Sequence, residues 1–176
     1  IVVVLTGENW WSAPQNLDPA DESALADYLD TGGNLLLVGQ DYMYGAHPSM
    51  GVCSGFPRDY LGLDRCYQDV LWGPNTADIT GSPDCIFEGE SATLDSANVF
   101  ISNPFFPDCA DPTPTARSGF RLDEAAQSGV VICNETDTFR TVWAGIELAA
   151  ASPEEFTHII QKIYDEKLME KSEQIE

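Results

Sequence analysis

The hydrophobic positions of the N-terminal part group into two continuous runs separated by an amphipathic stretch. Residues 1–5 are aliphatic throughout and residues 34–39 have an aliphatic centre, which is typical of strands buried on both faces. Between them, Asp18 and Pro19 predict a helix start, because Asp accepts from open backbone amides and Pro fits the first turn. Gly32 marks the end of that helix. The pattern predicts two parallel strands joined by a right-handed helical crossover.

Regular periodicity returns in the C-terminal part of the chain. Residues 129–133 and 139–145 are apolar segments around a polar turn, which favours a hairpin. Ser152 and Pro153 repeat the cap-and-proline helix start, and acidic residues follow in the first turn. An apolar stripe within residues 156–164 predicts a final amphipathic helix.

The middle of the chain shows no such regularity. Residues 66–120 contain short extended pieces among many Gly and Pro residues, and four prolines fall within residues 103–115, which predicts a loop there. We therefore expect one domain of residues 1–167 with a long, loop-rich insertion, followed by a polar tail of residues 168–176.

Charge excludes several classes of partner. Of the 176 residues, 43% are hydrophobic, which suits one domain with a real core. There are 29 acidic residues against 8 basic ones, a formal net charge of -21. Nucleic acids and anionic membranes both require basic surfaces, so neither is an expected partner. No apolar run is long enough to cross a bilayer, and we expect no membrane insertion.

The five cysteines indicate an oxidising compartment, either extracellular or at the cell surface. They form no CxxC pair, and four of them lie in polar, turn-rich stretches, where disulfides connect loops. Proximity in the sequence favours the pairs Cys53–Cys66 and Cys85–Cys109, although four cysteines allow three pairings. Cys133 ends an apolar run and is expected to be a buried thiol.

One block of the sequence resembles a known family. Residues 27–41, Asp-Tyr-Leu-Asp-Thr-Gly-Gly-Asn-Leu-Leu-Leu-Val-Gly-Gln-Asp, are similar to the helix–GG–strand segment of class I glutamine amidotransferase-like domains of large secreted prokaryotic proteins. Residues 58–62 and 139–147 also resemble this group. The resemblance implies a flavodoxin-like α/β fold, a three-layer sandwich around a mainly parallel, doubly wound sheet. In secreted members such a domain accompanies other modules.

The catalytic residues of that family are missing from their expected positions. Enzymes of the family carry a Cys within Gly-x-Cys-x-Gly at a strand-to-helix turn, whereas residues 38–42 contain no Cys. The His-x-Glu pattern is absent as well, since His158 is followed by two isoleucines. This departure from the family pattern argues against amidotransferase activity.

Candidate ligand-binding residues follow the second predicted strand. Gln40 and Asp41 stand at its carboxyl end, where open parallel sheets bind ligands, and His47 lies in the loop beyond. They would bind a small polar molecule or a cation. The alternative is that Asp41 caps a turn and Gln40 bonds to loop backbone.

Two further kinds of site are indicated by local sequence. Asp108 and Asp111 are neighbouring acids in a turn-rich stretch, and hard cations prefer several oxygen ligands, so calcium is a candidate cofactor. Solvated loop acids are the alternative. Asn134 begins an Asn-Glu-Thr sequon in a predicted turn, which makes it a candidate glycosylation site.

These observations favour a non-enzymatic module of a larger secreted or surface protein. Its expected partners are neighbouring domains of the parent protein or identical copies. Because the chain opens directly on an apolar run, we expect further residues upstream in that parent. Two alternatives stay open: a hydrolase of peptidase or glycosidase type with its site at the strand ends, and a domain that binds calcium or a small ligand.

Overall fold

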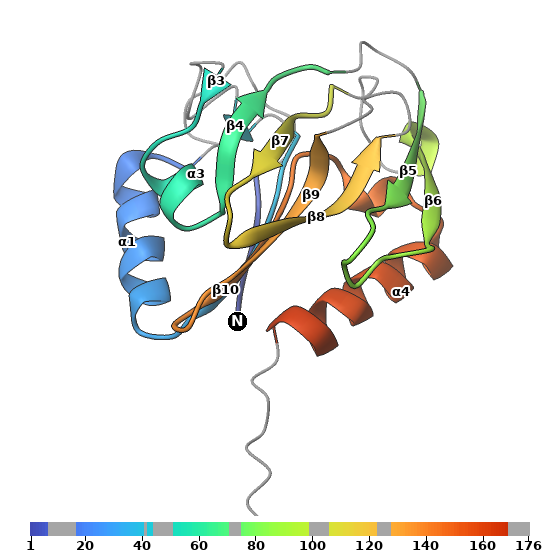
Figure 1. The fold of residues 1–176 in the computed structure, drawn as a ribbon. Helices are drawn as coiled ribbons and strands as arrows, with labels where there is room; N and C mark the ends of the chain where they lie inside the picture. Colours follow the sequence, from blue (N-terminus) through green and yellow to red (C-terminus); the bar gives the residue numbers. More distant parts are fainter. Residues whose placement is uncertain are drawn as a thin grey trace, which may run out of the picture.

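A mixed β-sheet forms the centre of the computed structural model, with helices on both of its faces (Figure 1). Ten strands of the described residues belong to this sheet. The described residues are 1–6, 17–40, 42–43, 51–70, 75–98, 106–122 and 128–168.

The predicted strand–helix–strand unit is present at one edge of the sheet. β1 (Val2–Leu5) and β2 (Asn34–Val38) are parallel neighbours, and α1 (Pro19–Asp30) connects them. The carboxylate of Asp18 accepts from the backbone amides of the first turn, as its sequence position predicts. β2 continues the parallel arrangement with β10 (Arg140–Ala144) on its other side.

The remaining strand pairs are antiparallel. β9 (Gly129–Glu135) and β10 form the predicted hairpin. Beyond β9 the sheet divides, because both β7 (Cys109–Pro112) and β8 (Ala116–Leu122) pair with its other edge. The first branch continues through β4 (Leu63–Tyr67) to β3 (Gly51–Val52), and the second through β5 (Thr76–Gly81) to β6 (Ser91–Asp95).

The fold is therefore α/β, as expected, but its sheet is largely antiparallel. Two strand pairs are parallel and seven are antiparallel among the described residues, so the expected mainly parallel, doubly wound sandwich is not what the chain forms. The supposed loop-rich insertion contains β5, β6 and β7 and parts of β4 and β8. β7 lies within the proline-rich stretch, and Pro112 is its last residue, where a missing N–H interrupts the ladder least.

Two separate cores lie on the two faces of the sheet. Leu35 and Leu37 of β2 belong to the core beneath α1 and α3 (Phe56–Asp59), whereas Leu36 and Val38 belong to the core beneath α4. This alternation follows from the two-residue period of a strand. Figure 1 shows α1 and α4 on opposite sides of the molecule. The elements not yet bounded are α4 (Pro153–Ile163) and three short turns of helix, η1 (Ser96–Asn98), η2 (Leu148–Ala150) and η3 (Tyr164–Leu168).

The capping box predicted at the last helix is formed. The Ser152 hydroxyl accepts from the Glu155 amide at 3.3 Å, and the Glu155 carboxylate accepts from the Ser152 amide at 3.1 Å. Within the described residues, no helix combines the length and apolar character that a bilayer crossing requires.

Candidate functional site

The carboxyl ends of β2 and β10 meet at one edge of the sheet. Because the two strands are parallel and paired in register, Gly39 and Gly145 follow them side by side, and the Gly39 amide donates to the Ala144 carbonyl at 3.0 Å. Open α/β sheets place ligand sites at such an edge. This edge is therefore a candidate location for functional side chains.

Gln40 lies at this edge but is turned into the protein. Its side chain is only 2% exposed, and its Oε1 accepts from the Phe106 backbone amide at 3.4 Å. The contact agrees with the alternative reading of the sequence, in which the Gln40 side chain bonds to loop backbone. Asp41 and His47, the other two candidate ligand residues, lie outside the described residues.

Asp108 joins this edge from the opposite direction. Its side chain is 1% exposed, its amide donates to the Gly145 carbonyl at 2.8 Å, and its Oδ1 accepts from the Asp69 amide at 3.3 Å. Asp69 has a φ of 49°, a left-handed conformation that Asp tolerates better than most residues. We call Gln40, Asp69, Asp108 and Glu147 the strand-end cluster.

Burial raises the pKa of two carboxyl groups and one thiol around this edge. It raises the pKa of Asp69 above its ordinary value. It also raises the pKa of Glu147, which lies two residues after Gly145 and accepts from the Ala149 amide at 3.3 Å. Burial, together with the nearby carboxylates of Asp108 and Asp111, raises the pKa of Cys109 to about 12. The raised pKa values favour the protonated forms of Asp69 and Glu147. Asp108 and Glu147 also have a structural role, because each accepts from a backbone amide.

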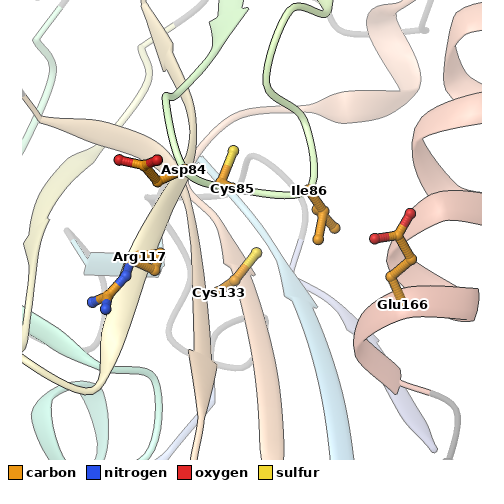
Figure 2. Close-up of a pocket in the computed structure, with 6 residues that line it drawn as sticks. All are labelled: Asp84, Cys85, Ile86, Arg117, Cys133 and Glu166. Carbon is orange, nitrogen blue, oxygen red and sulfur yellow. The ribbon is translucent and has the colours of Figure 1, made fainter.

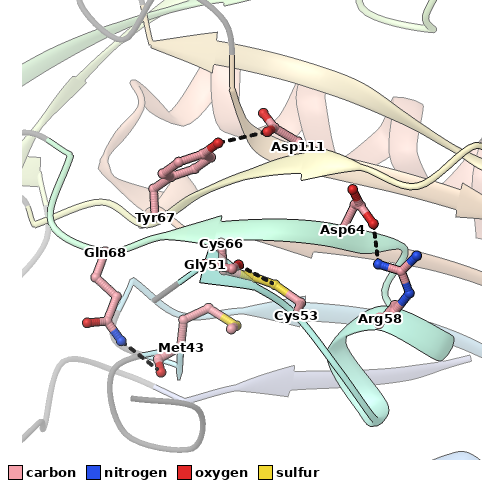
Figure 3. Close-up of a disulfide and its surroundings, with 9 residues drawn as sticks. All are labelled: Met43, Gly51, Cys53, Arg58, Asp64, Cys66, Tyr67, Gln68 and Asp111. Carbon is pink, nitrogen blue, oxygen red and sulfur yellow. Dashed lines mark hydrogen bonds and ion pairs between the residues drawn. A yellow bond between two sulfur atoms is a disulfide. The ribbon is translucent and has the colours of Figure 1, made fainter. Parts of the chain in front are cut away.

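The two aspartates predicted as calcium ligands have different partners. Asp111 accepts from the Tyr67 hydroxyl at 2.8 Å (Figure 3) and from the Ser128 hydroxyl at 2.9 Å. Asp108 instead accepts from the Asp69 backbone amide. Among the residues that the structure describes, no three His, Cys, Asp or Glu side chains gather as a metal site. Calcium binding stays a prediction.

Asn134 belongs to β9 and not to the turn that the sequence predicted. It is 2% exposed, and its Nδ2 donates to the Tyr60 carbonyl at 2.9 Å. Thr141, its partner across the hairpin, donates to the same carbonyl at 2.7 Å. The folded domain therefore does not present this amide to solvent, and glycosylation itself stays a prediction.

Of the two predicted disulfides, one is formed. Cys53 and Cys66 are linked, which ties the residue after β3 to β4 (Figure 3). The expected Cys85–Cys109 bridge is wrong, since both are free thiols. Cys109 is buried in β7 opposite Tyr67, whereas Cys85 lies in the turn between β5 and β6.

Sequence reasoning also missed a pocket on the α4 side of the protein. It has a volume of about 320 Å³, and Figure 2 shows side chains from four separate segments around it. We call it the thiol pocket, lined by Asp84, Cys85, Ile86, Arg117, Cys133 and Glu166. The signal available in the sequence was Cys133, but its expected burial gave no indication of a second thiol nearby.

No protein-family model matches the sequence, and comparison with curated proteins gives no significant match. Comparison with solved structures defines the class of fold as one found within larger enzymes and in smaller domains. A β-galactosidase from Bacillus circulans sp. alkalophilus is similar, with a TM-score of 0.62 and 13% identity over 93% of this chain. Gan42B, a GH42 β-galactosidase from G. stearothermophilus, is similar with a TM-score of 0.62 and 11% identity over 92% of this chain.

The chain spans only about a fifth of these galactosidases, 22% and 21% of their respective lengths. A third similar structure, the mmIFT52 N-terminal domain, has a TM-score of 0.53 and 12% identity, and the match covers 92% of this chain and 75% of that one. At such low identity the likeness establishes the fold alone. The resemblance to class I glutamine amidotransferase-like, flavodoxin-like domains is thereby corrected, because the similar structures are galactosidase segments and the sheet is largely antiparallel.

Proposed function

We propose that this chain is one domain of a larger secreted glycoside hydrolase and that it supports the enzyme by packing against neighbouring domains. The observation that carries the proposal is the pair of coverage values. Nearly the whole chain matches β-galactosidase structures, yet it accounts for about a fifth of them. These two values support a place for the chain as one domain within a larger catalytic protein.

An exposed apolar row, formed by β1 and the residue before it, supports a packing role. Ile1, Val3 and Leu5 are 49%, 57% and 72% exposed, while Val2 and Val4 between them pack against the core beneath α1. β1 pairs only with β2 among the described strands, so it is an edge of the sheet. Neighbouring apolar side chains on a sheet edge are typical of surfaces that another domain or chain covers.

The hydrogen bonds of the strand-end carboxylates support the same role. Glycoside hydrolysis requires two carboxyl groups held across a sugar, one as acid and one as base or nucleophile. Asp108 is almost completely buried and accepts from the Asp69 amide, and Glu147 caps a short helical turn. Both contacts hold backbone in place. The Cys53–Cys66 disulfide is compatible with a secreted parent.

The test compares the parent protein with this chain alone. Nitrophenyl-β-galactoside hydrolysis is expected from the parent and not from the isolated chain. Leu5→Asp in the parent is expected to expose the junction to limited proteolysis, whereas Val52→Asp, at an equally exposed valine on β3, serves as the matched control. Equal protease resistance of the two variants would contradict the packing role.

A second candidate is that the strand-end cluster itself hydrolyses glycosides. The observation in its favour is the raised pKa of Glu147, since a general acid must hold its proton near neutral pH. In this case the isolated chain hydrolyses the galactoside, and Glu147→Gln abolishes the activity. The same assay therefore separates the two candidates.

A further inference from the structure

Two cysteines from distant parts of the sequence share the thiol pocket. Cys85 lies in the turn between β5 and β6, and Cys133 lies near the end of β9. In Figure 2 the sulfur of Cys133 points toward the segment that carries Cys85. Neither belongs to the Cys53–Cys66 disulfide.

Gly119 of β8 lies next to both sulfur atoms. The Cys85 thiol donates to the Gly119 carbonyl oxygen at 3.2 Å. A Cβ placed on Gly119 would lie 3.4 Å from the Cys133 Sγ. The absence of a side chain at this position therefore leaves room beside both thiols, where any larger residue would project toward Cys133.

The two thiols differ in how easily a reagent reaches them. Cys85 is partly exposed, whereas Cys133 is only 6% exposed. Burial raises the pKa of Cys85, although the Phe87 amide, which donates to its sulfur at 3.3 Å, favours the thiolate. A dissolved reagent is therefore expected to react first at Cys85, and faster as the pH rises.

The third thiol, Cys109, is too far from Cys133 to pair with it. Cys109 precedes Ala110, whose partner on β9 is Gly129, four residues before Cys133. A strand rises about 3.3 Å per residue, which separates the two positions by roughly 10 Å or more, and disulfides require Cα atoms within about 7 Å. Cys109 is also fully buried.

We propose that Cys85 and Cys133 form a dithiol pair that a small-molecule disulfide oxidises to a second protein disulfide, closing the pocket. The Cys85 thiolate attacks the oxidant, an S–S bond forms to one half of it, and the other half leaves as a thiol. The Cys133 thiolate then attacks the Cys85 sulfur and releases the second half. The protein loses two protons and two electrons, and the oxidant becomes two thiols. This inference does not depend on the proposed role in a glycoside hydrolase.

The experiment treats the full chain with oxidised glutathione, blocks remaining thiols with N-ethylmaleimide in denaturant, and maps the peptides by mass spectrometry without reduction. Cleavage at Asp and Glu is suitable because acidic residues separate all five cysteines in the sequence. The expected product contains Cys85 linked to Cys133, with Cys109 blocked by the maleimide. Before the maleimide step, the intact mass is expected to fall by two hydrogen atoms.

Two variants make the result specific. In Cys133→Ser, the glutathione adduct at Cys85 is expected to persist, because no second thiol resolves it. Cys109→Ser, the matched control, is expected to give the same Cys85–Cys133 link as the parent. A lasting adduct at Cys85 in the unmodified chain, or no reaction at either thiol, would overturn the proposal. If Cys133→Ser does not fold, the peptide map of the unmodified chain decides alone.

Discussion

The backbone of Asp108 and the backbone of Gly145 approach so closely that no side chain fits between them. The Asp108 amide donates to the Gly145 carbonyl at 2.8 Å, and a Cβ on Gly145 would lie 2.4 Å from the Asp108 carbonyl oxygen. The contact fixes the segment before β7 against the end of β10. It therefore holds Asp108 at the end of β10.

Gly145→Ala is expected to lower the free energy of unfolding by about 1–3 kcal/mol, because the new methyl group must displace backbone in a packed region. Urea denaturation monitored by tryptophan fluorescence measures the change. Gly119→Ala is the comparison, since its nearest contact is a side-chain methyl of Val131 at 3.1 Å, which has more freedom to shift. A larger loss for Gly119→Ala would contradict the argument.

Tyr42 is expected to make stability depend on pH in the alkaline range. The residue is completely buried, and its hydroxyl donates to Glu22 at 2.7 Å. Burial, followed by the charge of Glu22 and this hydrogen bond, raises the pKa of Tyr42 far above its ordinary value. The unfolded chain ionises this phenol near pH 10. The contribution of Tyr42 to the free energy of unfolding is therefore complete below about pH 10 and declines above it.

Tyr42→Phe is expected to cost about 1–2 kcal/mol at pH 7, because a hydrogen bond to a charged group is lost. The difference between parent and variant should shrink above pH 10, which urea midpoints across the alkaline range can follow. Tyr164→Phe, at an exposed tyrosine, is the matched control and is expected to change little. A difference that stays constant up to pH 11 would exclude the mechanism.

The Cys53–Cys66 disulfide is expected to contribute about 3 kcal/mol to stability, since it closes a short loop in the unfolded chain. The sequence separation is 13 residues. The double variant Cys53→Ala, Cys66→Ala should therefore have a lower Tm in calorimetry. Reductant should lower the Tm of the parent to that of the variant while leaving the variant unchanged. An effect of reductant on the double variant would show another source of stability.

Lys162 and His158 connect α4 to the segment before β6 through Glu90. The ammonium group of Lys162 pairs with one carboxylate oxygen of Glu90, and the His158 Nε2 lies 3.2 Å from the other. Burial alone would raise the pKa of Glu90, but the hydrogen bonds and charges of these two partners outweigh it, and the pKa is lowered. The contribution of Glu90 to stability is present above the ordinary pKa of Glu, and it is lost as the pH falls through the lowered pKa of Glu90.

Lys162→Gln is expected to cost about 1 kcal/mol at pH 7, the upper part of the range for partly exposed ion pairs. The loss should disappear in strongly acidic solution, where Glu90 is protonated in both proteins. Chemical denaturation at neutral and acidic pH measures it. The same loss at both pH values would show that Lys162 acts through packing of its aliphatic stem instead.

Local signals predicted the elements that depend on neighbouring residues. The helix starts at Asp18–Pro19 and Ser152–Pro153 are capped as expected, because a cap needs only side chains and amides within one turn. The hairpin of β9 and β10 and the nearby Cys53–Cys66 bridge belong to the same category. In each case the interacting groups lie within a few residues along the chain or in consecutive elements.

The middle of the chain could not be predicted in the same way. β5 alternates exposed and buried residues, but its six residues are interrupted on both sides by turn formers, and its partners β6 and β8 follow later in the sequence. Short strands of this kind are stabilised by their partners and by burial more than by their own propensity. The sheet is largely antiparallel because these middle strands pair antiparallel with their neighbours.

The candidate site was also predictable only in part from the sequence. The sequence placed Gln40 at a strand end, but only the tertiary structure turned its amide toward the Phe106 backbone. The sequence also indicated five cysteines and an oxidising compartment. Which thiols share a pocket depended on the fork of the sheet at β9, which places Cys85 and Cys133 in one lining and leaves Cys109 on the other branch.

The sequence by itself determined the α/β class, the acidic surface, the capped helices and the local disulfide, because each follows from composition or from contacts within a short stretch. Only the tertiary structure decided the strand directions, the burial of Asn134 and the composition of the thiol pocket. These depend on pairings between residues far apart in the chain, and a single strand carries little information about its distant partner.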